Sequence, residues 1–245
     1  MRYPTISFQR WTRKAGALLG PLVFSFAGGH FRSAVTSQSV DALGRPIPWY
    51  TYPAVDFLST LEVTQCRVAE FGSGNSTVWW ASRAASVLAL ESDPRWFERV
   101  QAQLKPWPTA SLSLIRTPQE AGALLPPDSF DIIIVDDGSG IGPTGRPLNA
   151  ETALRRVKPT GIVIVDNSDT NYSRPGHYPI IELANELGFQ RVDFHGHAAG
   201  STKKSCTSLF FRPEVTLLSN LKPPSAAQIR RIGGSDVGTT MSRAA

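Results

Sequence analysis

Apolar and polar positions alternate along the chain so that strands and helices are predicted in regular succession from Arg67 onward. Five short runs rich in β-branched or apolar residues lie at 67–71, 87–91, 111–116, 130–137 and 161–167. Each is followed by a segment of helical composition, at 76–84, 94–104, 118–125, 148–157 and 179–187. This alternation is typical of βαβ units, whose parallel strands form one sheet covered on both faces.

The last two apolar runs follow a different pattern. Between 191–197 and 207–212 there is only the polar segment AAGSTKKSC, with no room for a crossover helix. Two strands joined in this way pair antiparallel. The predicted fold class is therefore α/β: a Rossmann-like, doubly wound, seven-stranded sheet, mostly parallel, with an antiparallel C-terminal hairpin.

The pattern also divides the chain into three parts. The 245 residues suit one α/β domain, which we place at 55–213. Residues 1–54 are predicted to form a basic N-terminal arm or lid. Residues 214–245 lose periodicity and are predicted to be a mobile tail.

The start of the arm allows more than one interpretation. A weakly apolar run, AGALLGPLVFSFAGG, follows the basic residues Arg2, Arg10, Arg13 and Lys14. We predict a helix or lid that packs on the domain, because glycines and Pro21 dilute the run and it is shorter than a membrane span. A secretory signal and a peripheral membrane anchor are the alternatives.

Charge is distributed unevenly. Residues 1–50 carry six Lys and Arg against one acid, residues 51–190 eleven against sixteen, and residues 191–245 eight against three. Basic arms around an acidic centre favour weak contact with an anionic surface, so a nucleic-acid partner is not expected. Cys66 and Cys206 are too few and too distant for a disulfide framework or a metal cluster, which favours a cytoplasmic protein.

Candidate chemistry begins at AEFGSGNSTVWW, between the first strand and the first helix of the domain. Gly72 and Gly74 permit a tight turn and close approach to a ligand, and Asn75, Ser76 and Thr77 begin a helix with free N–H groups. Glu91 ends the second strand, where an acid can accept the two hydroxyls of a ribose. This pattern suits any adenosine cofactor, NAD included.

Glu70 distinguishes between the candidate cofactors. A carboxylate at this position would repel the pyrophosphate of a dinucleotide, but it suits a cofactor that carries an ammonium and a sulfonium. Glu70-Phe71-Gly72-Ser73-Gly74 resembles the first motif of class I S-adenosylmethionine-dependent methyltransferases, and Glu91 resembles their second. The resemblance covers roughly 55–212. PWYTYP at 48–53, followed by EFGSGNST, is similar to a group of bacterial methyltransferases. The resemblance implies S-adenosylmethionine held by Glu70, Gly72, Ser73, Gly74, Ser76, Thr77, Glu91 and Asp136.

Oxygen-bearing side chains also end the fourth and fifth strands. Asp136, Asp166 and Asn167 would meet at the sheet edge and could hold Mg²⁺ or another divalent cation. They resemble the metal ligands of catechol O-methyltransferase, although Ser139 stands where that family has a lysine base. An acid at the end of strand four also serves methyltransferases that use no metal, so both readings stay open.

The expected reaction is in-line methyl transfer to an oxygen of a small molecule or glycan. The sulfonium already activates the methyl group, so alignment and exclusion of water are the main tasks of the protein. Asp137 and His177 are the candidate catalytic bases. The rival predictions are an NAD-linked oxidoreductase and a non-catalytic nucleotide-binding or assembly protein.

Overall fold

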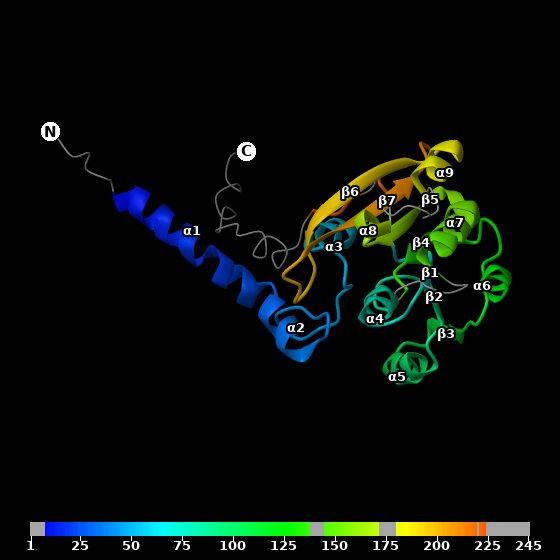
Figure 1. The fold of residues 1–245 in the computed structure, drawn as a ribbon, viewed down its shortest axis with the longest axis horizontal. Helices are drawn as coiled ribbons and strands as arrows, with labels where there is room; N and C mark the ends of the chain where they lie inside the picture. Colours follow the sequence, from blue (N-terminus) through cyan, green and yellow to red (C-terminus); the bar gives the residue numbers. More distant parts are fainter. Residues whose placement is uncertain (1–7, 138–144, 172–179, 220, 224–245) are drawn as a thin grey trace, which may run out of the picture.

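A computed structural model describes residues 8–137, 145–171, 180–219 and 221–223, and its centre is one seven-stranded sheet (Figure 1). The strand order is β3-β2-β1-β4-β5-β7-β6. The strands are β1 (Arg67–Phe71), β2 (Ser86–Glu91), β3 (Ala110–Leu114), β4 (Phe130–Val135), β5 (Val157–Asp166), β6 (Gln190–His197) and β7 (Lys204–Phe211). Strands β1 to β5 run parallel, while β7 pairs antiparallel with both β5 and β6. The predicted fold class is confirmed, including the terminal hairpin.

Helix α3 (Tyr52–Ser59) precedes β1, and further helices connect the strands from β1 to β6. They are α4 (Asn75–Ala81), α5 (Pro94–Leu104), α6 (Pro118–Leu124), α7 (Arg146–Arg156), α8 (Ser168–Asn171) and α9 (Ile180–Glu186). Several begin where the sequence provides a cap or a proline: the carboxylate of Asp93 accepts hydrogen bonds from the first turn of α5, and Pro94 occupies that turn. These signals explain why the predicted and observed bounds of α5 coincide.

Two apolar layers cover the two faces of the sheet. Alternate residues of β1 and β4, such as Phe71 and Ile133, pack with α6, α7 and α9. Their neighbours, such as Val68 and Ile132, pack with α3 and α4. Because both faces are covered, the central strands are apolar at nearly every position, as expected for a buried parallel sheet.

The body of the protein extends past the predicted boundary at residue 213. Val215, Leu217 and Leu218 pack against the layer of α3 and α4. Leu221 forms a bridge with Leu61, and the Lys222 ammonium pairs with Glu62. Described residues as far as Lys222 therefore contact the domain, while 220 and 224–245 lie outside the described residues.

The arm contains two helices and a strap. Helix α1 (Phe8–Ala27) projects away from the α/β body in Figure 1, and α2 (His30–Thr36) lies at its base. The strap at 48–53 is part of the body, because Tyr50 is fully buried and the backbone N–H of Thr51 donates to Thr207 Oγ1 on β7 at 3.1 Å. In the described part of the chain no helix is both long and apolar enough to cross a membrane.

Candidate functional site

A cavity of about 730 Å³ lies at the carboxyl ends of the parallel strands. Strands β1 and β4 are adjacent there, and their following helices α4 and α7 cover opposite faces, which is the usual ligand position in a doubly wound sheet. The arm forms part of the rim through residues 37–39 and Trp49. The Asn75 side chain donates to the carbonyl of Ser39 at 2.8 Å, so the arm is tied to the loop after β1.

Gly72 and Gly74 act in different ways in that loop. Gly72 has φ +95°, and a Cβ there would lie 2.6 Å from the carbonyl oxygen of Asp136. Only glycine therefore permits the ends of β1 and β4 to approach so closely. Gly74 faces the cavity, and a Cβ there would meet nothing closer than the Trp96 ring at 3.9 Å. Gly72 thus shapes the loop, while Gly74 keeps space open beside it.

Glu70 and Thr77 lie beneath the loop and are not among the residues that line the cavity. The Thr77 hydroxyl donates to Glu70 Oε2 at 2.6 Å and accepts from the backbone N–H of Gly74 at 3.0 Å. Ser76, the residue before Thr77, lines the cavity. In place of the predicted direct ligand contact, the buried carboxyl of Glu70 holds the loop from behind.

Burial raises the pKa of Glu70 to about 8. The folded protein then keeps a proton that the unfolded chain loses near about pH 4.3. The contribution of Glu70 to stability should therefore be most favourable below that value and fall by up to a few kcal/mol as pH rises toward 8. In Glu70→Gln, whose amide oxygen still accepts from Thr77, we expect a shallower fall. Urea unfolding between about pH 5 and about pH 9 measures the difference, and identical slopes for both proteins would contradict this explanation.

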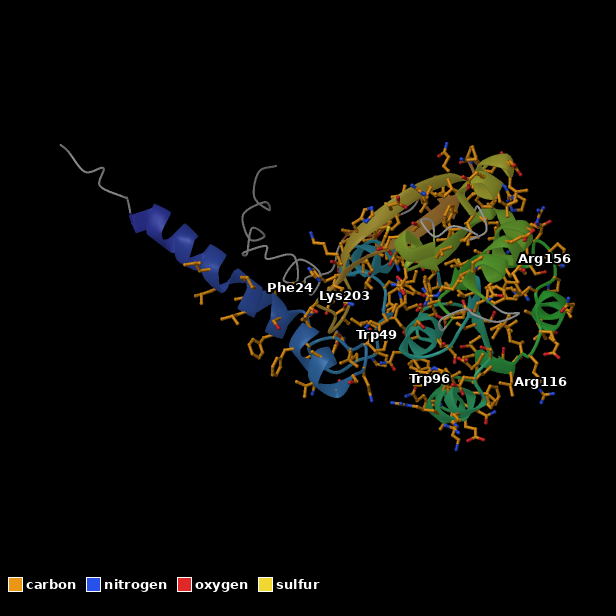
Figure 2. All side chains as sticks on the ribbon, viewed as in Figure 1. Phe24, Trp49, Trp96, Arg116, Arg156 and Lys203 are labelled. Atoms are coloured by element: carbon orange, nitrogen blue, oxygen red, sulfur yellow. The ribbon has the colours of Figure 1, made fainter. Side chains whose placement is uncertain are left out.

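Glu91, Ser73 and Trp96 form one wall of the cavity. Glu91 Oε2 accepts from the Ser73 hydroxyl at 2.6 Å, while Oε1 accepts from the backbone N–H groups of Ser92 and Asp93 at 2.8 and 2.9 Å. The Trp96 indole N–H donates to the carbonyl of Ser73 at 2.6 Å. Figure 2 shows Trp96 on the α5 side and Trp49 nearer the arm. Trp96 was not among the predicted site residues, although its place in the first turn after the Asp93 cap was a signal.

Arg146 connects the strand-end oxygens on the opposite wall. Its guanidinium donates to the carbonyls of Asp137 and Asp166 at 2.6 and 2.8 Å, to Asn167 Oδ1 at 2.9 Å, and to Asp136 Oδ1 at 3.0 Å. Asp136, Asp166 and Asn167 do converge and line the cavity, as predicted. The cation between them, however, is the arginine.

The predicted divalent cation is therefore not supported. A metal bound by Asp136, Asp166 and Asn167 would have to occupy the space that Arg146 fills. The guanidinium already supplies the positive charge that such a cluster of oxygens requires. Sequence reasoning missed Arg146 because the residues before it, 138–144, separate it from β4 without any periodic signal.

The two cavity acids on this wall carry raised pKa values. Burial raises the pKa of Asp166 to about 8, and the negative charge of Asp136 adds to the shift. Burial also raises the pKa of Asp136 to about 6, although Arg146 opposes the shift. The Thr207 hydroxyl donates to Asp166 Oδ1 at 2.6 Å and fixes the orientation of that carboxyl.

Of the two predicted catalytic bases, the structure describes only Asp137. Asp137 is buried and is not among the residues that line the cavity; burial raises its pKa to about 7. Its backbone approaches the loop at Gly72. Asp166, which was predicted to bind a metal, lines the cavity together with Asp136. His177 lies outside the described residues.

A second group of ligand-type side chains lies on the terminal hairpin. The Sγ of Cys206 is 3.9 Å from His195 Nε2, and Asp193 is close to both. Asp193 already accepts from Ser208 at 2.5 Å and pairs with Arg191 at 3.0 Å. We therefore treat this cluster as part of the hydrogen bonding between β6 and β7.

Comparisons with known proteins support the fold. No protein-family model matches the chain, and no curated protein matches its sequence. A spermidine synthase solved with the transition-state analogue AdoDATO is 14% identical, with a TM-score of 0.52, over 70% of this chain and 61% of that one. The precorrin-6y C5,15-methyltransferase of Geobacter metallireducens is 15% identical, with a TM-score of 0.50, over 65% and 87%.

The spermidine synthase of Thermotoga maritima is also similar, with 15% identity and a TM-score of 0.50 over 71% of this chain. This chain thus spans about three fifths of the length of the spermidine synthases, which are 61% covered. Identities this low carry information about the fold alone. The chain has the Rossmann-like fold of class I S-adenosylmethionine-dependent methyltransferases, shared with spermidine synthases.

Proposed function

We propose that the protein is an S-adenosylmethionine-dependent methyltransferase that methylates an oxygen of a small molecule or glycan. The observation that carries the proposal is that one cavity has two different walls. Glu91 and the glycine loop form one wall, and Asp166 with Arg146 forms the other. A donor bound on the first wall would present its methyl group toward the second.

The first wall suits an adenosine cofactor. Both oxygens of Glu91 are held by hydrogen bonds, so the carboxylate is fixed where it can accept from ribose hydroxyls. The Trp96 ring borders the same space and offers a flat apolar surface to an adenine. Gly74 also lines the cavity and has no side chain to occupy the space beside the edge of that ring.

The second wall favours a neutral acceptor. Asp136 is paired with Arg146, and the raised pKa of Asp166 keeps that carboxyl largely protonated at neutral pH. Lys203 and Lys204 add positive charge at the rim. A polycationic acceptor would bring further positive charge to a wall where Arg146, Lys203 and Lys204 already outnumber the ionised acids Asp136 and Asp169. A hydroxyl of a sugar or small molecule meets no such penalty.

In the proposed reaction, an acceptor oxygen attacks the methyl carbon in line with the sulfur. The new C–O bond forms as the C–S bond breaks, and the hydroxyl proton passes to the Asp166 carboxylate. Alignment and exclusion of water account for most of the rate, and Asp166 adds base catalysis once it is ionised. Both described cysteines are free, which suits the reducing cytoplasm.

The rate should therefore rise with pH through the pKa of Asp166. We expect kcat/KM of the wild type to rise with pH, with the midpoint of the rise near 8. In Asp166→Asn this rise should disappear, and activity should be about 100-fold lower. Thr207→Val, which removes the hydrogen bond to Asp166, is the positioning control and should shift the midpoint upward. A wild-type profile retained by Asp166→Asn would remove the base assignment.

Turnover separates the proposal from its rivals. The protein is incubated with S-adenosylmethionine and a panel of sugars, phenols and amines, and S-adenosylhomocysteine is measured. Release that depends on hydroxyl acceptors supports O-methylation, whereas release with amines alone would contradict it. Intact donor with every acceptor would favour the non-catalytic binding protein.

A further inference from the structure

Helix α1 exposes a continuous apolar face. Leu18, Leu22 and Phe26 lie four residues apart, on one side of the helix, and are 81%, 56% and 60% exposed. The neighbouring positions Leu19 and Val23 are exposed as well. A globular protein normally turns such a stripe toward its own core, so its exposure requires an explanation.

The domain contacts the other side of this helix. The Phe24 ring meets the buried Tyr52 edge-on, with centroids 5.3 Å apart, and also lies 5.7 Å from the ring of His30. This contact sets the orientation of α1 at its base. The apolar stripe is therefore directed away from the body from which the helix projects in Figure 1.

The exposed surface continues from α1 onto α2. The Phe31 ring lies 5.0 Å from that of Phe26, and Val35 is exposed one turn further along α2. We call this surface the arm face; it consists of Leu18, Leu19, Leu22, Val23, Phe26, Phe31 and Val35. Two helices thus present one apolar surface of Leu, Val and Phe.

Charge indicates what covers the arm face. Residues 8–40 contain Arg10, Arg13, Lys14 and Arg32 and no Asp or Glu. Two such arms would repel each other, which disfavours a second copy of the chain. An anionic lipid surface offers both an apolar layer for the face and negative charge for the basic residues.

We propose that α1 and α2 lie in the plane of an anionic membrane surface and anchor the protein there through the arm face. The anchor lies on the membrane and does not cross it, since α1 is too weakly apolar for a span. Residues 37–39 follow α2 and line the cavity, so anchoring would also hold the cavity mouth near the lipid. The proposal concerns binding alone and does not depend on turnover.

Vesicle flotation with the full chain tests this anchor. Vesicles of phosphatidylcholine are compared with vesicles that contain about 30% phosphatidylglycerol, each in low and high salt. Wild type should float with the anionic vesicles and release partly in high salt. Leu22→Glu/Phe26→Glu should weaken that binding by about 100-fold or more, because two apolar anchors are lost and two negative charges are gained.

Gln101→Glu/Ala102→Glu is the matched control, because it adds the same charge at exposed positions of α5. It should float like wild type, and both double variants should keep the wild-type melting temperature. Absence of wild-type binding to anionic vesicles would overturn the proposal, as would equal binding by both double variants. Lipid-free dimerisation that Leu22→Glu/Phe26→Glu abolishes would also overturn it, because a second copy would then cover the arm face.

Discussion

Gly74→Val should weaken binding of S-adenosylhomocysteine by at least about 100-fold while the protein stays folded. A Cβ at this position meets no atom of the protein closer than 3.9 Å, so the new side chain costs little in the free protein. It would instead fill the space beside Trp96 that we assign to the cofactor. Calorimetry measures the affinity, and thermal unfolding checks the fold.

Gly72→Ala is the contrasting variant. Its Cβ would lie 2.6 Å from the Asp136 carbonyl oxygen in a backbone with positive φ, so we expect a loss of stability of several kcal/mol. Of the two glycine variants, only Gly74→Val should therefore lose cofactor binding while it keeps the stability of the wild type. Wild-type affinity in Gly74→Val would mean that the cofactor does not occupy this part of the cavity.

Arg146→Met should both destabilise the protein and abolish most activity. The guanidinium is largely buried, and its removal leaves Asp136 and two backbone carbonyls without their donor. Breaking a buried charge pair in this way costs about 3–5 kcal/mol. Asp136 and Asp166 would also repel each other more strongly, so we expect turnover to fall at least about 100-fold. Urea unfolding and initial rates measure the two effects.

Arg146→Lys and metal ions provide the controls. One ammonium is not able to reproduce the forked contacts of Arg146, so Lys should restore the charge but only part of the stability. Mg²⁺ should change neither the melting temperature nor the rate of wild type, and EDTA should leave the rate unchanged. Wild-type stability in Arg146→Met, or a rate that requires Mg²⁺, would contradict the role given to this arginine.

The sheet could be predicted because its signals are local. Buried runs such as 130–135 and 161–166 are apolar at nearly every position, and a cap with a proline marks the start of α5. The antiparallel hairpin followed from a missing crossover helix between β6 and β7. The boundary at 213 was placed too early, because the apolar residues that pack beyond it lack a regular period.

The candidate site was predictable only in part. The strand ends bring Glu91, Asp136 and Asp166 to one cavity, as topology requires. Whether a strand-end acid lines the cavity or lies behind it depends on backbone detail that the sequence does not show, as Glu70 and Asp137 illustrate. Arg146 reaches these acids from the start of helix α7, and no spacing rule in the sequence connects it to them.

Calorimetric titration of wild type and Glu91→Ala with S-adenosylhomocysteine and with NADH tests the central claim most directly. We predict that wild type binds S-adenosylhomocysteine and not NADH. Glu91→Ala should bind it at least about 10-fold more weakly, because the ribose loses its fixed acceptor. Binding of NADH without S-adenosylhomocysteine, or equal affinity in the two proteins, would contradict the account.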